Sequence, residues 1–335
     1  MPATPDPIEN QASATTLPAV ICAGMVVIDH VTPPIDRLPR SGELVSVEHL
    51  VLSTGGGAAN TAVDLARLGV SVRLCARVGD DIFGRFAALT LVAHGVDTTA
   101  LHVDVNHETS QTLIVNVRGE DRRFIHCLGA NRAFTPADLD AILDPPPRVL
   151  HIGYFLLMPG LDAAGLARRL ARARQLGTIT LVDVATPGPG NYLEPLRAVL
   201  PHTDVFVPNT DEAALILGED DPVRQAFAFH EMGAGRVVIT RGERGLVSVS
   251  DQHGVALPAF SVPFIDGTGG GDAFNAGYIV GMLEGRSELD CLKLASAVGA
   301  SCIRAIGATA GVFTRAEADD FLSRHDLPVH PLQRA

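Results

Sequence analysis

Glycines gather in front of an expected helix within residues 265–285. Four of them surround Thr268, namely Gly267, Gly269, Gly270 and Gly271. Backbone N–H groups in such a turn converge on an anion, and the dipole of the following helix adds attraction for negative charge. Asp272 opens the helix, so a carboxylate lies beside this anion hole. The combination suits transfer of a phosphoryl group to an alcohol, because the carboxylate can take the hydroxyl proton while the amides hold the transferring charge.

Asp272 also has a simpler interpretation as a cap, since aspartate is favoured at helix N-termini. A cap needs one aspartate, whereas this segment adds three consecutive glycines and a second carboxylate, Asp266, six residues earlier. These additions favour a chemical site, and capping stays open as the alternative.

The 26 basic residues include a single lysine, Lys293. A Walker A loop needs a lysine on the phosphates, and Schiff-base enzymes need a lysine amine. Lys293 lies within a helical apolar pattern, where a charged residue is expected to face solvent. Both lysine-dependent chemistries are therefore disfavoured.

Strands and helices alternate from residue 18 onward. Residues 19–29 form a near-continuous apolar run, typical of one strand buried on both faces, and residues 58–69 follow as a helix. The same pattern predicts further strands at 71–79, 148–155, 178–184, 205–209 and 236–242, with helices at 81–95, 161–177, 193–200 and 210–218. Only helices are expected from about Asp272 on. Repeated strand–helix units predict an α/β fold, a doubly wound and mostly parallel sheet with helices on both faces.

Two segments instead alternate with period two, residues 43–54 and residues 112–130, the second turning at Gly119 to Asp121. If they pair, they form a small discontinuous β-sheet that projects from the main domain as a lid. An extension of the main sheet's edge is the alternative.

These boundaries predict one large domain, residues 18–330, with lid strands inserted at about 43–54 and 110–130. Residues 1–17, rich in proline, alanine and threonine, are expected to be a disordered tail.

A second glycine turn precedes the helix at 58–69. Gly55, Gly56 and Gly57 would let the backbone approach a small ligand closely, and Asn60 can donate to and accept from hydroxyl groups. Taken alone, such a turn is more often structural.

Both glycine segments resemble signatures of the PfkB carbohydrate kinases, also called the ribokinase-like family. Residues 266–272 read DGTGGGD, where the family usually has DTTGAGD, and residues 54–85 contain a GGxxAN turn, LARLG and GDDxxG. The resemblance implies a ribokinase-like fold and ATP-dependent transfer of the γ-phosphoryl group to a hydroxyl of a small carbohydrate, with Mg²⁺. Asp272 would be the base, and the amides of the three consecutive glycines would stabilise the phosphoryl group.

The resemblance also assigns the sugar site. Asp29 falls at the end of the first expected strand, where open α/β sheets bind ligands, and there the family has a sugar-hydroxyl acceptor. Gly56, Gly57 and Asn60 would complete the site. Arg132, which follows the lid strands, is a candidate contact for an acidic or phosphorylated sugar, the alternative being a solvated loop arginine.

The nucleotide site comes from the same resemblance. The NxxE motif of the family matches Asn209 and Glu212, which implies contacts with the nucleotide phosphates and, for Glu212, the Mg²⁺–water network. A stretch like T-x-G-x-x-G adds three nucleotide-binding candidates, Thr240, Gly242 and Gly245. Asp266 and Thr268 match positions at which family members bind a monovalent cation such as K⁺. Taken singly, Asp29, Asn209 and Glu212 are also explained as caps or surface polar groups.

Composition limits the partners. The 335 residues are 47% apolar with a net charge of −12, so the chain can bury a large core but lacks the basic field that binds nucleic acid. No uninterrupted apolar run reaches the length of a membrane span. Five cysteines without CxxC spacing suggest neither disulfides nor zinc, and so a cytoplasmic protein. Exposed lid edges make a homodimer through the lid plausible.

Three other functions compete with a sugar kinase. A nucleoside kinase would share the fold, and a non-catalytic sugar-binding regulator would have no need of Asp272. A nicotinamide oxidoreductase is disfavoured because TGGGAAN lacks the last glycine of GxGxxG. The identity of the sugar is not encoded in these motifs.

Overall fold

The computed structural model describes residues 17–332 except 121–122, 187 and 252. Of the predicted tail only Leu17 is described, and Asp121 of the predicted turn also lies outside the described residues. No helix of this described part is long and apolar enough to cross a membrane.

The main sheet has ten strands in the part of the chain that the structure describes. In spatial order they are β14 (His330–Pro331), β13 (Gly254–Leu257), β12 (Leu246–Ser250), β11 (Arg236–Thr240), β10 (Val205–Phe206), β9 (Ile179–Val182), β8 (Val149–Gly153), β1 (Val20–Gly24), β4 (Val72–Gly79) and β5 (Asp97–Asp104). From β11 to β5 all pairs are parallel, whereas β11 to β14 pair antiparallel. The predicted mostly parallel sheet is confirmed, and the antiparallel edge is an addition that the sequence patterns missed.

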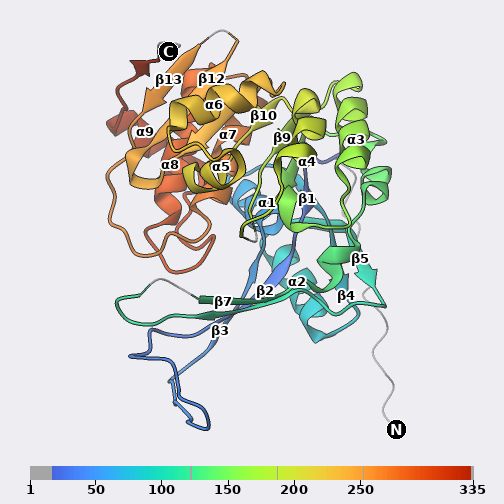
Figure 1. Ribbon diagram of the computed structural model, residues 1–335, viewed down its shortest axis with the longest axis vertical. Helices are drawn as coiled ribbons and strands as arrows, with labels where there is room; N and C mark the ends of the chain where they lie inside the picture. Colours follow the sequence, from blue (N-terminus) through green and yellow to red (C-terminus); the bar gives the residue numbers. More distant parts are fainter. Residues whose placement is uncertain (1–16, 121–122, 187, 252, 333–335) are drawn as a thin grey trace.

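Helices cover both faces of this sheet (Figure 1). One face carries α1 (Gly57–Arg67), α2 (Ile82–Ala93), α7 (Gly270–Leu283), α8 (Glu288–Cys302) and α9 (Arg315–Arg324). The other carries α3 (Ala163–Gln175), α4 (Leu193–Val199), α5 (Thr210–Leu217) and α6 (Pro222–Glu231). Successive residues of β1 enter opposite clusters, Val20 and Cys22 the first, Ile21 and Ala23 the second. Burial on both faces explains why these strands read as continuous apolar runs.

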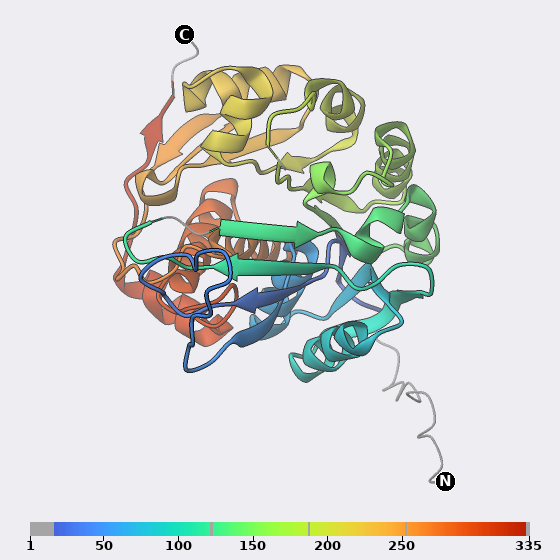
Figure 2. The ribbon, with the colours of Figure 1, turned by 60° about the horizontal axis from the view of Figure 1, so that its bottom comes forward.

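A separate lid sheet projects from one end of the main body (Figure 1), and Figure 2 shows its strands side by side. Its order is β3 (Val51–Gly55), β2 (Val27–Val31), β6 (Gln111–Val115) and β7 (Arg123–Cys127). The β6–β7 hairpin agrees with the prediction, and the separate sheet rules out the edge-extension alternative.

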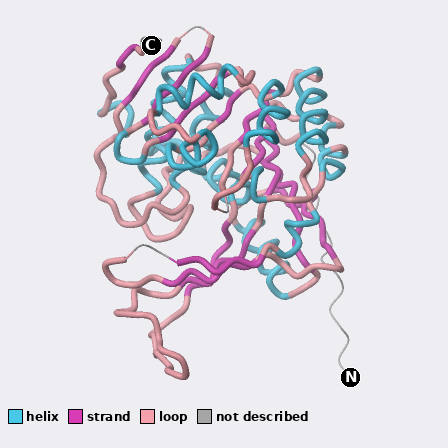
Figure 3. The backbone as a smooth tube through the Cα atoms, viewed as in Figure 1, coloured by secondary structure: helices cyan, strands magenta, loops and turns pink. Residues whose placement is uncertain are grey.

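The predicted lid strand at 43–54 is largely wrong. Pairing is confined to Val51–Gly55, and the residues before it form a loop, drawn pink in Figure 3. Leu44 is 84% exposed and Leu50 is 65% exposed. The apolar alternation there faces solvent, so it has no buried face to hold a strand.

The single strand predicted at 19–29 is also wrong, because the run contains β1 of the main sheet and β2 of the lid. The strands separate at Gly24, which has φ 142° and whose added Cβ would lie 2.4 Å from the carbonyl oxygen of Gly153. Met25 and Val26 cross between the sheets and are buried, so the apolar run continues through the break. Asp29 therefore lies within the lid sheet, paired with Ser53, and not at the end of a main-sheet strand.

Strand order reverses between β1 and β8, which lie side by side although β4 and β5 follow β1 in the chain. Crevices at such switch points bind ligands at the carboxyl ends of the strands. The residues after β8 and β9, Tyr154 and Asp183, therefore lie where a ligand site is expected.

Candidate active site

The candidate active site centres on Asp272 in the first turn of α7. Gly269 is the N-cap, with φ 78°, and the amides of Gly270 and Gly271 begin the helix. The Asp272 side chain is not that cap, and the residue is only 2% exposed. The carboxylate is thus held in the protein interior, which the capping interpretation does not explain.

Two side chains from distant elements bind one oxygen of Asp272. Asn60 donates from Nδ2 to Oδ2 at 2.7 Å, and the Tyr154 hydroxyl donates to the same Oδ2 at 3.2 Å. The other oxygen, Oδ1, is buried and has no hydrogen-bond partner among the described residues. Since a buried oxygen without a partner is costly, Oδ1 is the atom left to accept a proton from a ligand.

Burial raises the pKa of Asp272 to about 7, against the lowering effect of the hydrogen bonds from Asn60 and Tyr154. The group therefore titrates near neutral pH, which is where a general base is most effective.

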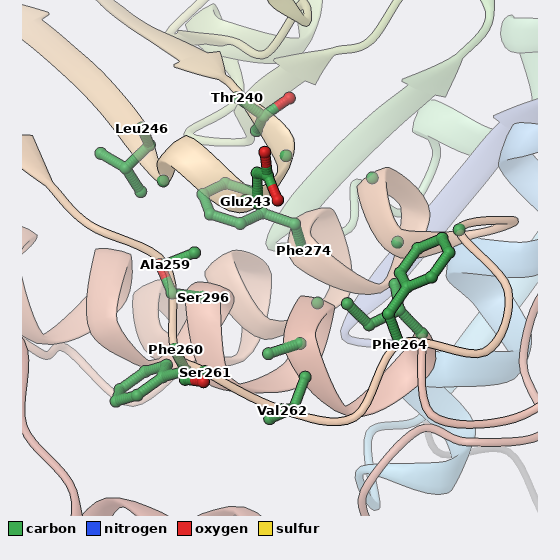
Figure 4. A pocket seen from close by; sticks show the side chains of 18 residues that line it. Thr240, Glu243, Leu246, Ala259, Phe260, Ser261, Val262, Phe264, Phe274 and Ser296 are labelled. Atoms are coloured by element: carbon green, nitrogen blue, oxygen red, sulfur yellow. The ribbon is translucent and has the colours of Figure 1, made fainter.

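A cavity of about 690 Å³ lies beside the start of α7. Figure 4 shows Thr240, Glu243 and Leu246 on one side and the segment with Phe260 and Ser261 on the other. Three predicted nucleotide residues line this cavity, namely Thr240, Gly242 and Gly245, together with Gly270 and Gly271 of the anion hole.

A second cavity of about 190 Å³ adjoins the first, since Thr240 and Gly267 are among the residues lining both. It contains the polar groups of the candidate site: Tyr154, Asp183, Asn209, Glu212, Gly269, Gly270, Gly271, Asp272 and Asn275. The structure thus brings together the predicted base, the glycine turn and the predicted nucleotide residues.

Asn209 and Glu212 both cap α5 and line the smaller cavity. Asn209 Oδ1 accepts from the Glu212 amide at 2.9 Å, and Glu212 Oε2 accepts from the Asn209 amide at 2.9 Å. Burial, with a smaller contribution from the charge of Asp272, raises the pKa of Glu212 to about 7. The two hydrogen bonds confirm that these residues cap α5, and their position in the cavity lining is compatible with a ligand role as well.

The sequence predictions missed Asp183 and Asn275 in this cavity. Asn275 donates from Nδ2 to Asp183 Oδ2 at 3.1 Å, and its own Oδ1 has no partner among the described residues. Burial raises the pKa of Asp183, and so do the charges of Glu212 and Asp272. Two signals existed: Asp183 follows a strand's carboxyl end, and Asn275 lies three residues after Asp272 on one helix face.

The residues predicted to bind the sugar lie on the lid side of the site. Asp29 Oδ2 lies 2.2 Å from where a Cβ on Gly55 would be, directly over the turn that contains Gly56 and Gly57. Burial raises the pKa of Asp29 to about 6. Arg132 is exposed. None of these predicted sugar-binding residues lines either cavity, and the structure links the group to the site through the contact of Asn60 with Asp272.

Asp266 and Thr268 form a local turn. Asp266 Oδ1 accepts from Thr268 Oγ1 at 2.7 Å, and Oδ2 accepts from the Gly307 amide at 3.0 Å. The single lysine, Lys293, forms an ion pair with Asp326 and lines neither of the two cavities. The site is therefore built without a lysine.

Asp64 is a buried carboxyl group one helical turn after Asn60. It has no exposed surface, and neither carboxylate oxygen has a partner within the described chain. Burial raises the pKa of Asp64 well above its usual value, and the charge of Asp272 adds to the shift. The folded protein therefore holds a proton that the unfolded chain releases above about pH 4.

We expect Asp64→Asn to flatten the pH dependence of stability. Because the folded state binds the extra proton, wild-type stability falls as pH rises from about 4 toward the raised pKa. The neutral amide removes this contribution, so the melting temperature of the variant should fall less between pH 5.5 and pH 8. Equal slopes for both proteins in thermal unfolding would contradict the assignment.

Sequence comparison decides the family. The pfkB family carbohydrate kinase model matches residues 19–315, nearly the whole described chain. This chain belongs to the pfkB family of carbohydrate kinases.

Individual pfkB relatives are similar over most of their length. A ribokinase from Bacillus subtilis is 27% identical over 288 residues, covering 86% of this chain and 94% of that protein. A fructokinase-2 from Zea mays is 26% identical over 322 residues, covering 91% and 94%. The structure of Arabidopsis thaliana ribokinase complexed with ribose and ATP has a TM-score of 0.80 at 21% identity, covering 92% of this chain and all of that one. This likeness establishes the ribokinase fold.

Proposed function

We propose that this protein is an ATP-dependent sugar kinase that transfers the γ-phosphoryl group to a hydroxyl of a small carbohydrate, with Asp272 as the base. The observation that carries the proposal is the buried Asp272 with Oδ1 unpartnered among the described residues, placed beside the glycine amides where two cavities meet. Family membership and the named ribokinase and fructokinase relatives support the substrate class.

The proposed step balances as an in-line displacement. The sugar hydroxyl gives its proton to Oδ1 of Asp272, and its oxygen bonds to the γ-phosphorus. The bond from that phosphorus to the β–γ bridging oxygen breaks, and ADP leaves with the electron pair. Amides of Gly269, Gly270 and Gly271 stabilise the negative charge of the transferring group.

The donor set of the smaller cavity fits Mg²⁺. Asp183 and Glu212 offer hard oxygen ligands, directly or through water, and their repelling charges would be relieved by a cation. Bound Mg²⁺ would neutralise charge on the nucleotide phosphates. A monovalent cation such as K⁺ is assigned to the turn of Asp266 and Thr268 on the family resemblance.

The nucleotide assignments follow the cavities, and the sugar assignments follow the family resemblance. The larger cavity would hold the nucleotide against Thr240, Gly242 and Gly245, with Asn209 near the phosphates. Asp29 and Asn60 would bind sugar hydroxyls near the turn of Gly56 and Gly57. Arg132 is proposed only for an acidic or phosphorylated sugar, which would have to extend toward it.

An ADP-release assay with a panel of sugars and Mg²⁺-ATP tests the function. Turnover of ribose, fructose or another small sugar supports it, and adenosine run in parallel tests the alternative of a nucleoside kinase. If neither a sugar nor adenosine increases ADP release above the rate without acceptor, the sugar kinase and the nucleoside kinase are both contradicted.

We expect kcat to rise with pH through about 7. Below that value Asp272 is protonated and cannot accept the hydroxyl proton, so activity is lost as pH falls. Initial rates at saturating ATP between pH 5.5 and 9 check this. A rate that is constant across that range would oppose Asp272 as base.

A homodimer through the lid is part of the proposal. The outer strand β7 exposes Phe124 and Ile125, 58% and 68% exposed, and Leu52 of β3 is 40% exposed. A second lid would cover these apolar side chains. Sedimentation velocity tests this, and a monomer at assay concentration would exclude the dimer.

A further inference from the structure

Tyr154 has a backbone conformation that side-chain-bearing residues rarely adopt. Its φ is 61° and its ψ is 43°, and it is the one non-glycine residue with positive φ in the described ranges. It directly follows β8 at the switch point and lines the cavity that contains Asp272. Such outliers persist where the surrounding structure holds them, often at functional sites.

The conformation of Tyr154 places its ring over Gly57. A Cβ added at Gly57 would lie 2.5 Å from Cδ1 of the ring and 2.6 Å from Cε1. Any larger residue at the first position of α1 would therefore displace the ring. From this position the Tyr154 hydroxyl donates to Oδ2 of Asp272.

We propose that Tyr154 is a positioning residue for the base, and that Gly57 is needed to make room for its ring. The inference rests on the proposed function. With Asn60, the Tyr154 hydroxyl fixes Oδ2, so that Oδ1 is the oxygen presented to the sugar hydroxyl. This role differs from sugar binding, the role assigned above to Gly57.

The two donors are not equivalent. Asn60 at 2.7 Å comes from α1, and Tyr154 at 3.2 Å comes from the end of β8, so together they hold the carboxylate from two directions. With one donor the carboxylate can rotate, and its charged form loses stabilisation. The Tyr154 hydrogen bond lowers the pKa of Asp272, so its removal should raise that pKa.

Tyr154→Phe removes only the hydroxyl and tests the proposal. We expect the acidic limb of kcat against pH, at saturating ATP, to move up by roughly half to one pH unit. The rate at pH 6.5 should then fall several-fold, while the rate at pH 9 stays closer to wild type. A residue that only supports the fold would lower kcat equally at every pH.

Tyr278→Phe is the matched control. Tyr278 is a buried tyrosine of α7 whose oxygen accepts from Arg236 at 2.9 Å, away from Asp272. We expect no shift of the acidic limb in this control. An unshifted limb in Tyr154→Phe, with or without a uniform loss of rate, would overturn the proposal. Absence of phosphotransfer by wild type would instead overturn the proposed function.

The pairing of Gly57 with Tyr154 is tested separately by stability. Gly57→Ala should lower the melting temperature because its Cβ meets the ring. In a Tyr154→Ala background the same change should have little effect, since the ring is gone. Equal losses in both backgrounds would show that the ring is not what restricts position 57.

Discussion

Asp272→Asn is expected to lower kcat by roughly 10²- to 10⁴-fold, the range typical of a lost general base. The amide can keep its oxygen toward Asn60 and Tyr154, so the geometry of the site should survive. Its NH₂ group would then replace Oδ1, and it can donate to a sugar hydroxyl but cannot accept a proton. The KM values for sugar and ATP should change little, because neither ground-state contact depends on the proton transfer.

The measurement is steady-state turnover by ADP release, with Asp320→Asn as the control. Asp320 lies on the exposed face of α9, so its substitution should leave both kcat and KM unchanged. Near-normal turnover by a folded Asp272→Asn protein would remove Asp272 from the mechanism. A rise in KM at constant kcat would reassign it to binding.

Gly269→Ala is expected to lower both stability and turnover. Gly269 has φ 78°, which costs an alanine roughly 1–2 kcal/mol, and an added Cβ would lie 2.1 Å from the carbonyl oxygen of Ala308. The turn must move to relieve this contact. Displacing the amides by about 1 Å should reduce kcat on the order of 10²-fold.

Gly271→Ala, two residues along the chain, is expected to impair the site without lowering stability. A Cβ there meets nothing within 4 Å, and alanine favours the helix, so the melting temperature should be unchanged or slightly higher. Because Gly271 lines both cavities, the added methyl should raise the KM for ATP. Equal melting temperatures for Gly269→Ala and wild type would contradict the strained turn.

The sequence was sufficient for the parts of the fold in which local pattern and tertiary environment agree. The βα units around β4 and β8 were predictable because each strand is mostly buried and mostly apolar and lies beside a segment of helical period. The glycine turn at 269–271 and Asp272 were predictable because an anion site at a helix N-terminus is a local arrangement. Asn60 was identified as a polar group, but its bond to Asp272 joins residues 212 positions apart.

Other features depend on packing that no local pattern reports. Met25 and Val26 are buried where the chain crosses between sheets, so hydropathy gives no sign of the break that puts Asp29 in the lid. The left-handed conformation of Tyr154 is imposed by its surroundings, since tyrosine does not favour it. Arg132 is exposed and lines neither cavity, which its position after the lid strands in the sequence does not indicate.

The lysine-free site has a consequence for chemical modification. The single side-chain amine that acylating reagents, including acetyl donors, can modify in this sequence belongs to Lys293. Its ammonium group is paired with Asp326 and lines neither cavity. The anion hole consists of main-chain amides, which such reagents do not acylate. Regulation by lysine acetylation, or inactivation by amine-directed affinity labels, therefore has no target in the described active site.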